Sequence, residues 1–376
     1  MVTIKKVETK KDLKRFIRFN YELYKDNKYA VPELYEDMLD TFSDKNAAME
    51  FCEVVYFLAY KDGKIVGRVV GILNHKANNI WKQKNVRFGW IDFIDDEEVS
   101  KALIDAVAEW GKERGMTQIH GPLGFTDNDP EGMLIEGFDE LSTMATIYNY
   151  PYYPQHMEKL GFEKDVDWIE MQLVAPRDGK MPERLTRIAE LLMKKFDFRI
   201  KKYKSIKQLA KEYGKDIFHV LNEAFKPLFG YNELSEKQVD QYIKMYLPLI
   251  DPKLVSLVTD SNGKLVAVGI SMPSLSEALQ KAKGKLFPLG WWYIFKALKL
   301  KKPKIVDLLL VGVLPEYQNK GVNSLLFYDL LPIYMKEGYE FAETHPELEY
   351  NHKVQQQWIY FDRRIHKRRR CFKKPL

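Results

Sequence analysis

The feature that most limits the possible folds is a pattern that occurs twice along the chain. Two apolar runs are joined by a short polar stretch that ends in glycine and lysine. The first copy is 54–60, Asp62-Gly63-Lys64 and 65–72, and the second is 254–258, Asn262-Gly263-Lys264 and 265–270. Apolar runs joined by Asp-Gly or Asn-Gly are typical of β-hairpins. The sequence therefore predicts one hairpin in two copies.

Each predicted hairpin is followed by a strand, a helix and a second strand. The expected elements are 86–93, 99–114 and 117–120 in the first half, and 305–313, 322–336 and 339–343 in the second. Each helix is followed by a glycine, Gly115 or Gly338, which is a common stop signal. Repeated units of one fold explain this order better than a single large sheet does.

A polar stretch with Pro176 and Gly179 separates the two halves and is typical of a linker. A chain of 376 residues is long enough for two domains. We therefore predict a mixed α/β fold with domains at 1–175 and 183–376. Each domain should hold a twisted mixed sheet flanked by helices.

The composition narrows the function classes only slightly. The net charge of +6 does not by itself indicate a nucleic-acid binder. Cys52 and Cys371 match no metal or disulfide spacing, and the seven histidines do not cluster, so we predict no metal. Neither a secretory signal nor an apolar stretch long enough to span a membrane is evident, so we expect a cytoplasmic protein.

The loop between the predicted strand 305–313 and the following helix has the features of a phosphate site. A helix N-terminus leaves N–H groups unpaired and carries a partial positive charge, which favours phosphate oxygens. Gly321 would let the backbone approach a ligand, Lys320 adds a positive charge, and Pro315 fixes the chain where it leaves the strand.

The segment Val313-x-Pro315-x-x-Gln318-x-x-Gly321-x-Asn323 resembles the acetyl-CoA signature of the GNAT acetyltransferases, in a bacterial group with two such domains in tandem. The family usually has Gly or Ala where this chain has Asn323. The resemblance implies acetyl-CoA, or another acyl-CoA, as co-substrate. The cofactor-binding residues that it implies are Leu310, Val311, Val313, Gln318, Asn319, Lys320, Gly321, Val322, Asn323 and Asn351.

The matching loop of the first half carries acids instead. Alignment of the two helices places Asp95-Asp96-Glu97 on Gln318-Asn319-Lys320 and Glu98 on Gly321. These charges would repel a diphosphate but suit the positive end of their own helix. We therefore expect a degenerate first domain that lacks the CoA pyrophosphate loop and serves as a scaffold or as a wall of the acceptor pocket. Near its end, His156 replaces a tyrosine that the family often uses to protonate the thiol.

The resemblance implies that an acceptor amine attacks the thioester, with a carboxylate taking its proton and a tyrosine protonating the sulfur. Glu343 is the preferred base, ahead of Asp307 and Glu349. Trp358 stands where the family has its tyrosine, and we take Tyr360 as the candidate acid.

The predicted function is an N-acyltransferase, most simply an acetyltransferase, acting on a small-molecule or peptide amine. The alternatives are a donor with a longer acyl or aminoacyl group, a non-catalytic CoA-binding sensor or scaffold, and a nucleic-acid binder that uses the basic tail.

Two further segments, one apolar and followed by lysines and one strongly basic, have more than one interpretation. The apolar residues 287–298, from Phe287 to Leu298, could make peripheral contact with a membrane. The interpretation that we favour is an inserted helix packed between the two domains. The tail 363–374 could contact nucleic acid or hold the 3′-phosphate of CoA, but we favour a last strand with a solvated basic face.

Overall fold

The computed structural model describes residues 1–176 and 178–376, apart from the side chains of Leu247 and Tyr360. The chain forms two compact units. Unit 1 comprises Met1–Ile169, Leu275–Phe295 and His366–Leu376, and unit 2 comprises Glu170–Ser274 and Lys296–Ile365. Neither unit is one continuous stretch, because the segment from Leu275 and the end of the chain group with unit 1. The predicted ranges 1–175 and 183–376 assigned both of these segments to the second domain.

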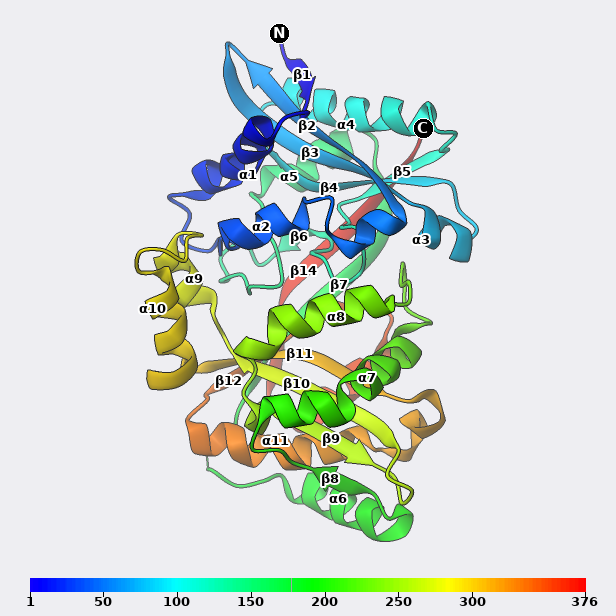
Figure 1. Ribbon diagram of the computed structural model, residues 1–376, viewed down its shortest axis with the longest axis vertical. Helices are drawn as coiled ribbons and strands as arrows, with labels where there is room; N and C mark the ends of the chain where they lie inside the picture. The colour runs from blue at the N-terminus through cyan, green and yellow to red at the C-terminus, as the bar shows by residue number, and fades with distance from the viewer. Residues whose placement is uncertain (177) are drawn as a thin grey trace. The chain divides into compact units, whose positions relative to one another are not determined.

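Unit 1 is built from a sheet with helices on its faces (Figure 1). Its strands are β1 (Thr3–Lys6), β2 (Cys52–Lys61), β3 (Lys64–Asn74), β4 (Asn85–Phe93), β5 (Gln118–Gly121) and β6 (Met133–Glu136). Its helices are α1 (Lys10–Tyr24), α2 (Tyr35–Thr41), η1 (Ala47–Glu50), α3 (His75–Ile80), α4 (Glu97–Lys112), α5 (Tyr152–Lys159), α9 (Ser276–Ala282) and α10 (Gly290–Phe295). Strands β7 (Glu163–Val174) and β14 (Arg363–Pro375) contribute residues to both units.

Unit 2 repeats this plan with strands and helices of its own (Figure 1). Its strands are β8 (Arg199–Lys201), β9 (Val255–Thr259), β10 (Leu265–Pro273), β11 (Ile305–Val313), β12 (Phe341–Thr344) and β13 (Glu347–Leu348). Its helices are α6 (Glu183–Phe196), α7 (Ile206–Phe225), α8 (Glu236–Tyr246), η2 (Leu247–Leu249), η3 (Pro252–Leu254), η4 (Lys296–Leu300, a π-helical turn), η5 (Pro315–Lys320), α11 (Asn323–Glu337), α12 (His352–Gln355) and η6 (Gln356–Tyr360).

The predicted repeat is present in both units. β2 and β3 form one antiparallel hairpin, and β9 and β10 form the other. Gly63 and Gly263 adopt the positive φ values of 75° and 83° that such turns require. After each hairpin, a parallel pair is joined by a helix: β4 with β5 through α4, and β11 with β12 through α11.

Glycines in the unit 2 sheet show how closely the helices cover its two faces. An added Cβ on Gly312 of β11 would lie 3.1 Å from Leu221 of α7. On Gly269 of β10 it would lie 3.6 Å from Leu326 of α11 instead. Because paired strands share their faces, α7 and α11 cover opposite sides of this sheet, with the apolar core between each helix and the strands.

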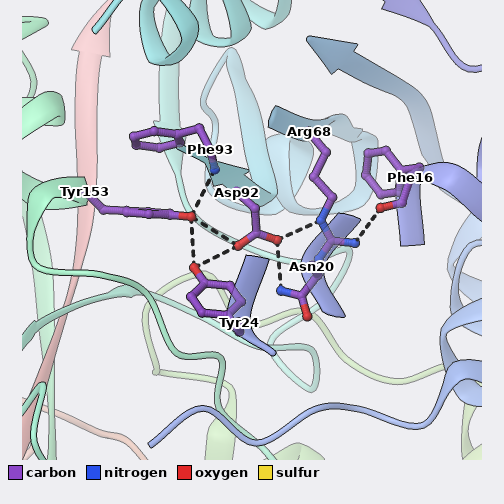
Figure 2. A network of polar contacts seen from close by, with 7 residues as sticks. All are labelled: Phe16, Asn20, Tyr24, Arg68, Asp92, Phe93 and Tyr153. Atoms are coloured by element: carbon purple, nitrogen blue, oxygen red, sulfur yellow. Dashed lines mark hydrogen bonds and ion pairs between the residues drawn. The ribbon is translucent and has the colours of Figure 1, made fainter. Parts of the chain in front are cut away.

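Unit 1 contains a buried polar network around one ion pair (Figure 2). The Arg68 Nε donates to Asp92 Oδ2 at 2.7 Å, and Asn20 Nδ2 donates to the same oxygen at 3.0 Å. The hydroxyls of Tyr24 and Tyr153 donate to Asp92 Oδ1 at 3.1 and 3.4 Å. Burial, followed by the neighbouring tyrosine and Asp92, raises the pKa of Tyr24 well above its usual value, so both tyrosines stay protonated donors.

The end of the chain forms a strand, as predicted. β14 pairs with β5, with Phe372 opposite Gly121. Its basic side chains meet acids: Arg370 bonds Asp167 at 2.8 and 3.0 Å, and Lys373 lies 3.2 Å from Asp165. Lys367 and Arg369 are buried, so the basic face of this strand is not solvated throughout as expected. Whether the tail contacts nucleic acid stays a prediction.

Candidate functional site

The sheet of unit 2 divides between its two parallel strands. Pairing of β11 with β12 ends where Leu308 lies opposite Thr344. β12 stops at Thr344, whereas β11 continues to Val313. Residues 309–313 of β11 therefore run on without a β12 partner and are half-buried for the most part. We call this stretch of β11 without a β12 partner the gap, and it leads into the predicted phosphate loop.

A β-bulge lies at the start of this gap. On the other side of β11, Ile270 of β10 faces Leu310 while the next residue, Ser271, faces Leu308. Leu309 is therefore an extra residue, and such bulges redirect the backbone and often lie beside functional sites. Sequence reasoning selected Leu310 and Val311 but missed Leu309, because a leucine within a leucine run carries no local signal.

The predicted phosphate loop leads directly into a helix whose first turn is uncapped. η5 ends at Gly321, which has φ of 74°, and α11 begins at Asn323. No side chain in the described part of the chain caps the start of α11. Asn319 and Lys320 are exposed, and Gly321 and Asn323 are half-buried. The helix start thus keeps its positive end toward solvent.

Two side chains of the loop are used to hold it. Gln318 donates from Nε2 to the Val313 carbonyl at 3.2 Å, which ties the loop to the end of β11. Tyr317 donates to Asp260 at 3.1 Å, and the Lys320 ammonium lies 4.5 Å from the centre of the Tyr317 ring. Gln318 therefore has a positioning role in this structure, while Lys320 keeps its charge at the surface.

Gly321 is needed for two separate reasons. Its positive φ disfavours residues with a Cβ. A Cβ would also lie 3.3 Å from Leu192 Cδ1 of α6, and no other heavy atom would lie within 4 Å. At Gly321 the loop is thus flanked by α6, with space beyond Leu192.

The matching helix of unit 1 begins in a different way. The side chain of Asp96 caps α4 by accepting from the Glu98 N–H at 2.9 Å. Lys61 lies 2.5 Å from Asp96, and Lys159 lies 2.5 Å from Glu97. These lysines, as hydrogen-bond donors, lower the pKa of Asp96 and Glu97 below the usual range. The acids at this position therefore cap α4 and pair with nearby lysines.

In unit 1, unlike unit 2, the chain itself occupies the matching position beside β4. Parallel pairing of β4 with β5 ends with Arg87 opposite His120. Beyond that point, the Leu123 N–H donates to the Phe88 carbonyl at 3.0 Å. A Cβ on Gly89 would lie 2.4 Å from the Leu123 carbonyl oxygen. The chain after β5 therefore lies where the equivalent strand of unit 2 leaves space.

The predicted base Glu343 lies on β12 and is buried. The register places it beside Asp307 of β11 and Gln172 of β7, and Gln172 Nε2 donates to Glu343 Oε1 at 3.5 Å. Of the other candidates, Asn351 precedes α12, and no hydrogen bond in the described part of the chain joins its side chain to the loop. Tyr360 ends η6, and its side chain lies outside the described residues.

A carboxyl that sequence reasoning missed lies between Glu343 and Glu349. The Trp358 indole donates from Nε1 to Glu347 Oε1 at 2.8 Å. Burial raises the pKa of Glu347 from 4.5 to about 8, although the hydrogen bond from Trp358 opposes this. Its Oε2 is buried and has no hydrogen-bond partner among the described residues. Trp358 stands where the family has tyrosine, so a tryptophan–carboxyl pair occupies this place.

An almost wholly apolar cavity lies beside these elements in unit 2. It is lined by Leu173, Val174, Ala175, Val306, Leu308, Phe327, Leu331, Tyr334, Tyr339, Phe341, Ala342, Trp358 and Phe361. Leu308 is the last residue of the parallel pairing, and Trp358 is the partner of Glu347. The cavity is thus bounded by the paired part of β11 and β12, by α11 and by η6, with a lining that suits hydrocarbon.

Two other expectations concern residues outside this site. The segment 287–298 was expected to be packed, but Phe287 is 75% exposed and Trp291 is 48% exposed. No metal was predicted, yet possible ligand atoms of His120, Asp165 and Cys371 lie within 4.8 Å of one another. Although burial opposes it, pairing with His120 and Lys373 keeps the pKa of Asp165 low, so this cluster is already charge-balanced.

Comparisons with solved structures define the fold. A tandem GNAT protein from the clavulanic acid biosynthesis pathway has a TM-score of 0.56 at 11% identity, covering 100% of this chain and 98% of that one. A GCN5-related N-acetyltransferase from Sphaerobacter thermophilus has a TM-score of 0.52 at 12% identity, covering 100% and 95%. This chain therefore has the tandem GNAT fold, as the motif predicted. No family model matches it.

Two curated proteins are similar in sequence over most of their length. Protein YghO of Escherichia coli (strain K12) is 28% identical over 323 residues, which span 84% of this chain and 80% of that protein. The bacterial ceramide synthase of Caulobacter vibrioides (strain NA1000 / CB15N) is 26% identical over 328 residues, which span 85% and 82%.

No helix in the described part of the chain has both the length and the apolar character to cross a membrane.

Proposed function

We propose that the chain is an N-acyltransferase that binds acyl-CoA in unit 2 and transfers the acyl group to an amine. The observation that carries this proposal is the uncapped start of α11 beside the gap in the sheet at Leu309. The helix start suits the diphosphate through its partial positive charge, while the N–H groups of Ser324 and Leu325 already donate to the carbonyls of Gly321 and Val322 at 2.9 and 3.0 Å. The gap suits an extended pantetheine arm, which would lie along residues 309–313.

The contrast between the units supports this assignment. Unit 1 fills the matching gap with its own chain and caps the matching helix with Asp96. A diphosphate placed there would also face the negative charges of Glu97 and Glu98. Unit 1 is accordingly proposed to serve as a scaffold or to contribute to acceptor binding, rather than to hold a second CoA.

The proposed reaction needs two proton transfers. The neutral amine attacks the thioester carbon, the C–N bond forms, the C–S bond breaks, and CoA leaves as the thiol. A carboxylate accepts the amine proton, and an acid supplies a proton to sulfur. Glu343 and Tyr360 are the proposed base and acid. Glu347 is a further candidate, because a pKa of about 8 lets it exchange protons near neutral pH.

We further propose that the donor carries a fatty acyl chain rather than acetyl. The apolar cavity next to Leu308 would accept the hydrocarbon. A ceramide is an N-acylated long-chain amino alcohol, so the name of the Caulobacter relative also favours a lipid amine as acceptor. Acetyl-CoA with a small amine acceptor is the simplest alternative.

Calorimetric titration with CoA, acetyl-CoA and palmitoyl-CoA tests the proposal. Gly321→Glu should weaken binding by more than about tenfold, since it adds a negative charge where the diphosphate would lie. Gly338→Glu is the matched control, because Gly338 ends the same helix, has φ of 81° and has no heavy atom near its added Cβ. Absence of binding by the native protein, or an equal loss in both variants, would refute the proposal.

A further inference from the structure

We infer that the region around α10 is a docking surface for an anionic lipid bilayer. Its centre is an apolar ridge of five side chains, namely Phe287, Leu289, Trp291, Trp292 and Phe295. Their exposed fractions are 75%, 57%, 48%, 39% and 44%, in that order. Large apolar groups so close together on a surface mark a contact site rather than the scatter of single residues that every protein shows.

The backbone holds the ridge outward. The Trp291 N–H donates to the Leu286 carbonyl at 2.8 Å, and its indole Nε1 donates to the Pro288 carbonyl at 3.0 Å. Ile294 and Gly290 are buried and anchor the opposite side of the helix. An added Cβ on Gly290 would lie only 1.8 Å from the Lys285 carbonyl oxygen, so the turn is tightly closed. The ridge is therefore a fixed feature of this helix.

The charges around the ridge indicate which kind of partner binds there. Within unit 1, residues 278–295 contain three lysines and no aspartate or glutamate. Lys283 and Lys285 form no ion pair within the described chain, and Lys296 is the next residue after Phe295 in the sequence. Exposed tryptophan and phenylalanine bordered by lysine fit the headgroup region of a bilayer, where the rings enter the interface and lysine meets anionic lipid.

A soluble protein partner would require a complementary acidic surface, and a second copy of this chain would bring two basic surfaces together. The bilayer fits both the apolar and the cationic parts. This inference does not depend on the proposed function, because it concerns α10 and its flanking residues rather than the α11 loop.

Co-sedimentation with vesicles tests the inference, using phosphatidylcholine alone and phosphatidylcholine mixed with phosphatidylglycerol. The native chain should bind the mixed vesicles and bind pure phosphatidylcholine at least about tenfold more weakly. Leu289→Ser with Trp292→Ser should reduce binding by about tenfold or more. The matched control is Ile80→Ser with Trp81→Ser, whose side chains are 52% and 38% exposed, and it should bind as the native chain does.

A second pair of double variants tests whether the lysines contribute to vesicle binding. Lys285→Glu with Lys296→Glu should reduce binding, while Lys11→Glu with Lys14→Glu makes the same change in net charge elsewhere and should have little effect. Gly321→Glu should bind vesicles normally even though it fails to bind acyl-CoA. The inference is overturned if the native chain ignores the mixed vesicles or if both members of a matched pair lose binding equally. It is also overturned if the ridge variant alters only the oligomeric state.

Discussion

The indole N–H of Trp358 donates a 2.8 Å hydrogen bond to Oε1 of Glu347. This tryptophan stands where the family places a tyrosine, and its carboxyl partner is buried enough to have a pKa of about 8. A tryptophan cannot protonate a leaving group, whereas a carboxyl with this pKa holds a proton at neutral pH. The pair therefore changes which residue could take part in proton transfer at this position.

The first prediction concerns the pH dependence of stability. The pKa of Glu347 is raised on folding from 4.5 to about 8, so its stabilising contribution is fully present below 4.5 and is lost as the pH rises through 8. Glu347→Gln should therefore flatten the fall in melting temperature between these pH values. Equal pH profiles for the variant and the native chain would show that Glu347 is not buried as described.

The second prediction separates ligand binding from helix stability at one position. Asn323→Asp changes charge at nearly constant shape in the first turn of α11. The new charge should stabilise the helix by about 0.3–1 kcal/mol, yet weaken palmitoyl-CoA binding by about tenfold. Asn323→Gly should retain binding. Unfolding by denaturant and calorimetry measure the two effects, and tighter binding by the aspartate variant would argue against a diphosphate here.

The third prediction concerns the network of unit 1 (Figure 2). Asp92→Ala leaves the Arg68 guanidinium buried without its carboxylate, which should cost about 3–5 kcal/mol in the free energy of unfolding. Asp105→Ala is the control, because its pair with Lys101 is exposed and should contribute less than about 1 kcal/mol. Similar losses for both variants in urea denaturation would contradict the burial of the network.

The fourth prediction tests the apolar cavity as the acyl site. Ala342→Phe should narrow the cavity and lower kcat/KM for palmitoyl-CoA by about tenfold relative to acetyl-CoA. Leu331→Ala, on the opposite wall, should widen it and shift the preference toward longer chains, at a cost of about 2–5 kcal/mol in stability. Unchanged chain-length preference in both variants would place the acyl chain elsewhere.

Local sequence signals were sufficient for much of the fold. The strand at 305–313 was predicted with the bounds that the structure shows, and the helix predicted at 322–336 differs from α11 by one residue at each end, because apolar patterning and flanking Pro and Gly mark their ends. The two glycine turns identified the duplicated hairpins, and the motif from Val313 to Asn323 led to the tandem GNAT fold.

Features set by distant parts of the chain could not be predicted. The bulge at Leu309 depends on the register with β10, and the pKa of Glu347 depends on burial that its neighbours in sequence do not reveal. The outward position of Trp291 also went unseen, since an aromatic run reads equally well as core. Whether Glu343 acts as the base stays a prediction, because its role depends on a bound acceptor.

The last strand has a consequence for how the chain is made. Because β14 completes the sheet beside β5, unit 1 lacks a strand until the residues from His366 onward have left the ribosome. The rest of its sheet is synthesised long before and must wait with an open edge, which is a site for mispairing. Unit 2 extends to Ile365, so neither unit can be completed before the last part of the chain is made, and division of the chain at the linker should leave the first piece unable to mature.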